Sequence, residues 1–223
     1  MTGFVENFAN LDTLAQVHPL LLDGLRLTAW LVLTVVPLGM GVGLGLAVLG
    51  SVGSRPLRVL LIGYIDLLRS FPPLVLLILV YYGGPFLGLR LPEFSAAVLA
   101  LVLNSSSYYG EIFRAGIESI PREQHEAARA TGLSVAQTLR FVILPQAIKN
   151  VVPPLTSNTV EVIKLTSIAS VVALPELLRA ALIAQGLVYN PTPLMAVAVL
   201  YAVVLWPLVR LVSRFERQLL AWR

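Results

Sequence analysis

Three long stretches without a charged residue decide what this chain can fold into. They run from Leu27 to Ser54, from Ser70 to Leu89 and from Ala180 to Leu208. A helix needs about 20 predominantly apolar residues to cross the hydrocarbon core of a bilayer, and each stretch is long enough. The apolar residues follow one another without the alternation of barrel strands, so the sequence predicts an all-α integral membrane protein.

The overall composition agrees with this class of protein. Of 223 residues, 57% are hydrophobic and 13% are charged, whereas average soluble domains carry about 25% charged residues. The chain has no cysteine, which excludes a disulfide framework and a thiolate metal site. Its formal net charge of +4 is too small to indicate nucleic-acid binding, so we expect no nucleic acid among its partners.

The distribution of basic residues predicts the number and direction of the spans. Eleven of the 16 Lys and Arg residues gather in three places: after the first apolar stretch (Arg55, Arg58), around 111–150 (Arg114, Arg122, Arg129, Arg140, Lys149) and at the end of the chain (Arg210, Arg214, Arg217, Arg223). Basic loops stay in the cytoplasm, so an even number of crossings separates the 111–150 segment from the C-terminus. The N-terminus is then outside and the C-terminus cytoplasmic, with five spans at about 24–50, 57–82, 94–116, 149–175 and 192–212.

Small residues and prolines predict how two of the spans pack. The first span holds two overlapping GxxxG pairs, which let helices approach closely. In the second span, two consecutive prolines predict a kink, and an arginine just before them is expected to serve structurally, by holding the freed carbonyl groups. The residues concerned are Gly39, Gly41, Gly43 and Gly45, and then Arg69, Pro72 and Pro73.

A polar segment at about 119–147 interrupts the apolar chain. We expect Ser119 to cap a first helix with Pro121 in its first turn, and Gly132 to end that helix in a left-handed conformation. Ser134 and Gln137 then form a capping box for a second helix, which runs to Pro145. The pattern predicts a helix-turn-helix between the third and fourth spans.

Three interpretations of this segment compete. A DNA-binding helix-turn-helix has the same two helices and glycine turn, but the segment lacks a third core helix and is tied to spans at both ends. A structural elbow at the membrane interface is the second. The third is a docking element for a soluble partner, favoured by the small Ala127, Ala128 and Ala130 beside Glu126, which let a partner's surface come close.

Here the residues resemble a known family. Glu126-Ala127-Ala128, Gly132 and Ile143-Leu144-Pro145 are similar to the EAA loop of the permease subunits of bacterial ATP-binding-cassette (ABC) importers, and within them to the histidine, glutamine and arginine uptake subfamily. The similarity continues at Arg69, Pro72, Asn104, Tyr108, Glu111, Arg114, Ser119-Ile120-Pro121 and Lys164. The chain departs from the family pattern at Ser70-Phe71, Glu123 and Leu165.

The resemblance implies a single type I transmembrane domain over residues 1–223, multi-pass in the bacterial cytoplasmic (inner) membrane. Its EAA loop would dock on a cytoplasmic dimer of ATP-binding subunits, which alone would hold ATP and magnesium. An extracytoplasmic solute-binding protein would deliver a polar amino acid to outer loops around 83–93 and 176–191, and a second permease would complete a homodimer or homologous heterodimer. The docking residues implied are Glu126, Ala127, Ala128, Gly132 and Pro145.

The chain is expected to have no catalytic, cofactor or metal site of its own. GxxxxGK[ST], the phosphate-binding loop of many ATPases, is absent, as is HExxH. The two histidines, His18 and His125, are predicted on opposite sides of the membrane. We therefore expect a conduit for amino acid transport and not an enzyme.

Polar residues inside the spans are the candidate substrate pathway, because ionisable groups there are costly. In the third span they are Asn104, Ser107, Tyr108 and Glu111, and in the fourth Ser157, Asn158, Glu161 and Lys164. Glu161 and Lys164 could bind both ends of a zwitterionic amino acid, or they could only pair with each other, one turn apart. Glu111 and Arg114 could instead be interfacial anchors.

Two other functions stay open at this stage. The chain could be a self-contained channel or ion-coupled carrier that uses Glu161 and Lys164 as a relay. It could also be a scaffold whose polar segment recruits a regulatory protein. Uptake by the chain alone in liposomes, without an ATPase, would distinguish the carrier from the importer.

Overall fold

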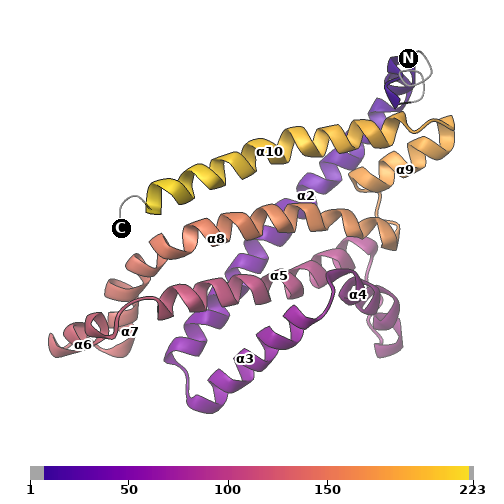
Figure 1. The fold of residues 1–223 in the computed structure, drawn as a ribbon. Coiled ribbons are helices and arrows are strands. Elements are labelled where there is room, and N and C mark those ends of the chain that lie inside the picture. The colour runs from indigo at the N-terminus through magenta and orange to yellow at the C-terminus, as the bar shows by residue number, and fades with distance from the viewer. Residues whose placement is uncertain (1–7, 221–223) are drawn as a thin grey trace. The chain divides into compact units, whose positions relative to one another are not determined.

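The computed structural model describes residues 8–220, with side chains as far as Arg214, and contains no strand over these residues. The all-α prediction is therefore confirmed for this part of the chain (Figure 1). The α-helices are α2 (Leu11–Val52), α3 (Arg55–Ser70), α4 (Pro73–Ile78), α5 (Glu93–Glu118), α6 (Arg122–Ala130), α7 (Val135–Thr138), α8 (Leu144–Leu165), α9 (Leu177–Val188) and α10 (Thr192–Leu220). Short π-helical (Leu79–Gly83, Leu139–Ile143) and 3-10 (Gly84–Leu87, Thr166–Val172) turns join some of them.

Within residues 8–220, two helices are long and apolar enough to cross a membrane, namely α2 and the Thr192–Arg214 part of α10. Two interrupted pairs, Arg55–Ser70 with Pro73–Leu87 and Val135–Val172 with Leu177–Val188, bring the number to as many as four. By this measure the central helix α5 is not among them, since Asn104 to Tyr109 make its middle polar. The membrane class is confirmed, while the five-span count and the orientation stay predictions.

The prolines of the second predicted span end a helix where a kink was expected. Helix α3 stops at Ser70, Phe71 takes an extended conformation (φ −80°, ψ 130°), and α4 starts at Pro73. The residue before a proline is pushed out of the helical region by the proline ring, which accounts for the conformation of Phe71. Proline also has no N–H for the helical ladder, so the ladder cannot pass Pro72.

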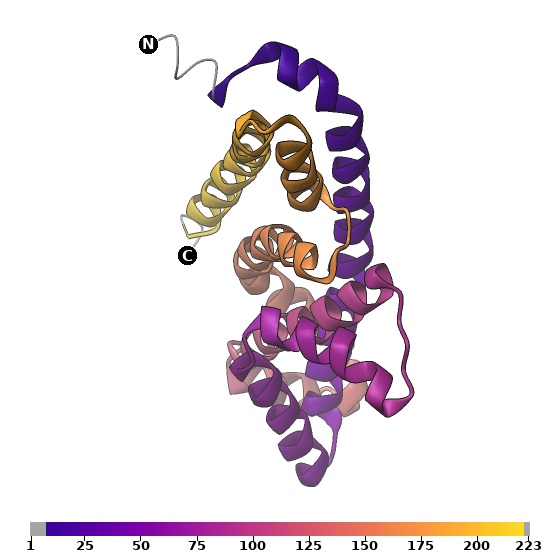
Figure 2. The ribbon, with the colours of Figure 1, turned by 90° about the vertical axis from the view of Figure 1, so that its right-hand side faces the viewer.

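The described residues form two compact units. The first unit comprises residues 8–35, 73–101 and 162–210, and the second comprises residues 36–72, 102–161 and 211–220. In the first unit α9 lies beside the start of α10 (Figures 1 and 2). The core between them is formed by Leu177, Ala181 and Val197, with Leu21, Leu25, Leu194, Leu200 and Tyr201 packed around it.

Residues 176–191, expected as an outer loop, are mostly helical. Glu176 is fully buried, and its carboxylate accepts hydrogen bonds from the backbone N–H groups of Leu178 (2.9 Å) and Arg179 (2.7 Å), which caps α9. The N–H of Leu177 donates to the hydroxyl of Thr28 on α2 (3.0 Å). All three bonds satisfy N–H groups in the first turn that have no partner within the helix, and the Leu177–Thr28 bond attaches α9 to α2.

The glycines of α2 divide into two faces. A Cβ atom on Gly43 would lie 2.6 Å from Tyr109 Cβ and 2.7 Å from the Gly110 nitrogen, so α5 lies against this face. Gly39 meets Ser105 of α5 in the same way, whereas nothing lies within 4 Å of a Cβ atom on Gly41 or Gly45. Close packing is confirmed for the pair Gly39/Gly43 and is wrong, within the described structure, for the pair Gly41/Gly45.

The core of the second unit joins the polar segment to the membrane helices. It consists of Ala47 of α2, Ile117 at the end of α5, Ile120, and three residues after the hairpin turn: Leu139, Ile143 and Ala147. Ile143 is fully buried. The hairpin of α6 and α7 is thus anchored by apolar contacts to α2 and α5 and does not hang free.

Candidate functional site

The first helix of the hairpin is capped differently from the prediction. Helix α6 begins at Arg122 directly after Pro121, whose extended ψ of 145° places it at the N-cap and not in the first turn. The predicted Ser119 cap is wrong, because the Ser119 hydroxyl donates to the carbonyl of Gly116 (2.7 Å) and accepts from the side-chain amide of Asn150 (2.8 Å). Ser119 therefore ties the end of α5 to α8.

The turn of the hairpin follows the prediction. Gly132 has a φ of +87°, in the left-handed region that glycine enters without a steric penalty. Its N–H donates to the carbonyl of Arg129 (3.0 Å), and that of Leu133 lies 3.4 Å from the carbonyl of Ala128. Ser134 and Gln137 form the predicted capping box: the Gln137 N–H donates to the serine hydroxyl (3.2 Å), and the Ser134 N–H donates to Gln137 Oε1 (2.8 Å).

The second helix does not end at Pro145 as predicted. Helix α7 continues through the π-helical turn Leu139–Ile143 directly into α8, with Pro145 near the start of α8. Pro145 has no N–H to donate to the carbonyl of Phe141, four residues before it. The π turn pairs residues five apart, so the N–H of Leu144 donates to the carbonyl of Leu139. The side-chain amide of Gln146 donates to Val142 (2.8 Å).

The predicted docking residues lie on different faces of the hairpin. Ala127, Ala130 and Pro145 are exposed, whereas Ala128 is only 6% exposed and packs within the hairpin. Glu126 is exposed and shares a helical face with Arg122 and Arg129, at spacings of four and three residues. The charged residues therefore form one face of α6, and the exposed Ala130, four residues after Glu126, lies beside it.

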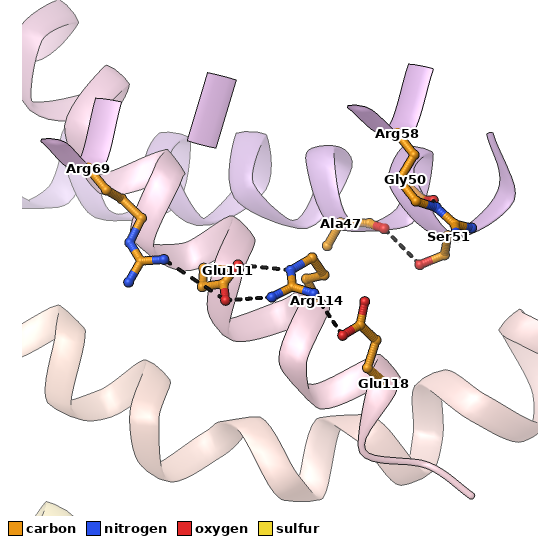
Figure 3. Close-up of polar contacts among 8 residues, drawn as sticks. All are labelled: Ala47, Gly50, Ser51, Arg58, Arg69, Glu111, Arg114 and Glu118. Carbon is orange, nitrogen blue, oxygen red and sulfur yellow. Dashed lines mark hydrogen bonds and ion pairs between the residues drawn. The ribbon is translucent and has the colours of Figure 1, made fainter. Parts of the chain in front are cut away.

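The structure brings three of the predicted polar residues together between α3 and α5. The guanidinium of Arg69 lies 5.4 Å from the centre of the Tyr108 ring and 3.9 Å from Glu111 Oε1. Glu111 is held more closely by Arg114, through bonds of 2.8 Å from Nε and 2.6 Å from Nη2 (Figure 3). Arg69 thus contacts a carboxylate and a ring in place of the freed carbonyl groups that the sequence suggested.

Arg114 also bonds Glu118, at 2.7 Å, one turn further along α5. The side chain of Glu111 is 28% exposed, that of Arg114 34% and that of Arg69 39%. Charges this close to water contribute little to stability one pair at a time, but the bidentate geometry fixes the orientation of Glu111. Of the two cationic partners of Glu111, Arg69 is the more distant, at 3.9 Å against 2.6 Å for Arg114.

The remaining pathway residues are divided between buried and exposed positions. Asn104 and Ser107 are buried on α5, Asn158 is half-buried on α8, and Ser157, Glu161 and Lys164 are exposed on α8. The side-chain amide nitrogens of Asn104 and Asn158 are buried and make no hydrogen bond within the described residues. A buried donor without a partner is costly, so these two amides are suited to bind a polar ligand or a further chain.

Tyr109 is a central residue that the sequence reasoning missed. It is fully buried, contacts the Gly43 face of α2, and its hydroxyl lies 2.9 Å from the hydroxyl of Thr159 on α8. One side chain of α5 thus contacts both neighbouring helices. The GxxxG pattern predicts that some residue packs against the glycines of α2. It identifies Tyr109 only once the rotation of α2 about its axis is known.

No group of three or more His, Asp or Glu side chains within residues 8–214 is arranged to hold a metal ion. The residues of the second unit form a polar helix face on α5 and a hairpin that is anchored to α2 and α5.

Comparisons with known proteins agree with one another. The family model described as "Binding-protein-dependent transport system inner membrane component" matches residues 36–220. The chain is 34% identical to the arginine transport system permease protein ArtQ of Bacillus subtilis over 215 residues, which cover 94% of this chain and 98% of that protein. It is 37% identical to the probable amino-acid ABC transporter permease protein YckA of the same organism over 153 residues, 69% of this chain and 66% of that protein.

Solved structures show the same relation. A crystal structure of an amino acid ABC transporter with histidines superposes with a TM-score of 0.85 at 36% identity, covering 94% of this chain and 99% of that one. An inward-facing structure of the MetNI methionine ABC transporter has a TM-score of 0.75 at 22% identity, covering 90% and 96%. The second likeness bears on the fold alone.

Proposed function

Because the chain belongs to the family of inner membrane components of binding-protein-dependent transport systems, we propose that it is the permease subunit of an ATP-driven importer for a polar amino acid. The cargo class is supported by relatives named for arginine and amino acid transport and by the likeness to a structure solved with histidines. ATP and magnesium bind on a separate subunit. The chain works by alternating access between outward-open and inward-open states.

The observation that carries this proposal is the anchored hairpin. A transport subunit driven from outside needs a rigid part that a motor can grip, and the core around Ile143 joins the hairpin to α2 and α5. Ala127 and Ala130 give α6 a small, exposed face that another protein surface can approach closely. In the proposed assembly this face, with Glu126, Gly132 and Pro145, contacts the ATP-binding subunit in the cytoplasm.

The polar residues of α5 and α8 are the proposed pathway. The unpartnered amide nitrogens of Asn104 and Asn158 are donors for a substrate carboxylate, and Glu161 and Lys164 are charged groups in the same span as Asn158. Five spans make too thin a wall to enclose a path alone, so two permease subunits form the translocation unit, and a solute-binding protein delivers the cargo from outside.

A pull-down with the ATP-binding subunit of the same transport system tests the docking role. Gly132→Ala places a side chain at φ +87° in open space, so its effect is confined to the turn. We expect association to weaken at least several-fold. Gly63→Ala is the matched control, because its surroundings are equally open and its φ is ordinary.

Reconstitution in liposomes tests the transport role itself. We expect amino acid uptake only when the permease, the ATP-binding subunit, ATP and the solute-binding protein are all present. Uptake by the permease alone would contradict the proposal and identify a self-contained carrier. No substrate-dependent signal in the complete system would instead indicate a scaffold.

A further inference from the structure

The second unit contains a cleft of about 650 Å³ to which the proposed function assigns no ligand, although one of its lining residues, Glu126, belongs to the proposed docking residues. The ends of α2 and α5, the start of α3, and the hairpin of α6 and α7 surround it. Its apolar lining is extensive and comes mainly from α2, α3 and α5: Leu46, Ala47, Leu61, Ile62, Ile65 and Ile117. The cleft thus lies where apolar helices give way to charged residues, as at the surface of a bilayer.

One face of α6 forms the charged side of this cleft. Arg122, His125, Glu126 and Arg129 line it, and their spacing of three, one and three residues places them on one side of the helix. Arg58 at the start of α3 lines the same cleft, and its Nε donates to the carbonyl of Gly50 at the end of α2 (3.0 Å; Figure 3). That bond fixes the guanidinium and leaves its terminal nitrogens available for an anion.

The charges in the cleft do not balance. Four arginines (Arg58, Arg114, Arg122, Arg129) and two glutamates (Glu118, Glu126) line it, which leaves an excess of two positive charges. Arg114 is already paired with Glu111 and Glu118. The excess therefore belongs to Arg58, Arg122 and Arg129, with Glu126 offsetting one of them.

We propose that this cleft binds a phospholipid with an anionic headgroup from the cytoplasmic leaflet. The three arginines bind the headgroup phosphate, for which guanidinium groups are well matched, and an acyl chain lies along Leu61, Ile62 and Ile65. Basic pockets between membrane helices on the cytoplasmic side bind such headgroups. The assignment to the cytoplasmic leaflet depends on the orientation given in the proposed function, whereas the assignment of the binding site does not.

The chemistry of the lining favours a lipid over the two other occupants. A soluble anion would bind the arginines but would make no favourable contact with the apolar residues that line the cleft beside them. A segment of the ATP-binding subunit would contact the exposed Ala127 and Ala130 of α6, and neither alanine lines the cleft. Only an amphiphile with a negative head satisfies both halves of the cleft.

Native mass spectrometry of the full-length, delipidated protein in detergent tests the proposal. Phosphatidylglycerol and phosphatidylcholine are titrated in parallel against wild type and the double variant Arg122→Gln/Arg129→Gln. We expect wild type to retain phosphatidylglycerol preferentially and the variant to bind it about tenfold more weakly or worse, since each basic residue contributes to attraction of anionic lipid. Arg140→Gln/Lys149→Gln is the control, because it removes the same charge from the same segment at exposed positions outside the cleft.

Four results would overturn the lipid site. The first two are equal binding of the two lipids and equal losses in the two double variants. The third is full competition by inorganic phosphate, which would indicate a soluble-anion site. The fourth is displacement of the lipid on adding the ATP-binding subunit, which would assign the cleft to that partner. The proposed function is measured separately by the pull-down, in which Arg122→Gln/Arg129→Gln should still associate with the ATP-binding subunit.

Discussion

At the scale of single residues, α2 shows how two identical spacings have opposite consequences. Gly39 and Gly43 lie against α5, whereas no other part of the described structure lies within 4 Å of where a Cβ would be on Gly41 or Gly45. The atoms around Gly43 include the backbone nitrogen of Gly110 and the carbonyl oxygen of Ser106, which cannot rotate away. The requirement for glycine is therefore specific to one face of the helix.

Gly43→Ala should destabilise the protein by about 1–3 kcal/mol, the usual cost of inserting a methyl group into a packed interface. Thermal unfolding of the purified protein in detergent would show a lower melting temperature. Gly41→Ala is the control, because the added methyl group has free space there and alanine favours helix. A drop of equal size in both variants would mean that contact with α5 does not determine the effect.

Tyr109 gives a second test at this scale. Tyr109→Phe removes the hydroxyl that lies 2.9 Å from Thr159 and leaves the buried ring in place. The loss should be about 0.5–1.5 kcal/mol, near the lower end, because the Thr159 hydroxyl also donates to Leu155 (2.8 Å). Tyr189→Phe, at a side chain that is 94% exposed, should leave the melting temperature unchanged.

At the scale of elements, the hairpin was largely predictable because its signals are local. The left-handed conformation of Gly132 and the Ser134–Gln137 capping box depend only on neighbouring residues, and both occur as expected. The exit of the second helix was not predictable from Pro145 alone, since the π turn before it restores the ladder. The partners of Arg69 and the burial of Glu176 depend on helices far away in sequence. The spacing of neighbouring residues therefore could not predict either of them.

Ser134→Ala removes one half of the capping box and should destabilise the start of α7 by about 0.5–2 kcal/mol. Hydrogen exchange followed by mass spectrometry would show faster exchange in residues 135–143, by about fivefold for 1 kcal/mol. Ser54→Ala is a matched control, because Ser54 occupies the N-cap of α3 without a side-chain hydrogen bond. Exchange in the hairpin that is unchanged by Ser134→Ala would mean that the apolar core alone holds it.

At the scale of the whole molecule, the proposed importer function requires that the hairpin lies on the cytoplasmic side of the membrane. The chain has no cysteine, so single cysteines can be labelled without background. Ala130→Cys marks the exposed face of α6, and Phe86→Cys marks a side chain that is 92% exposed in the predicted outer loop. A membrane-impermeant maleimide added to intact spheroplasts should label Phe86→Cys and should reach Ala130→Cys only after permeabilisation, because basic segments stay in the cytoplasm. Labelling of Ala130→Cys from outside would place the hairpin beyond the reach of any cytoplasmic ATPase, whatever the resemblance of its sequence.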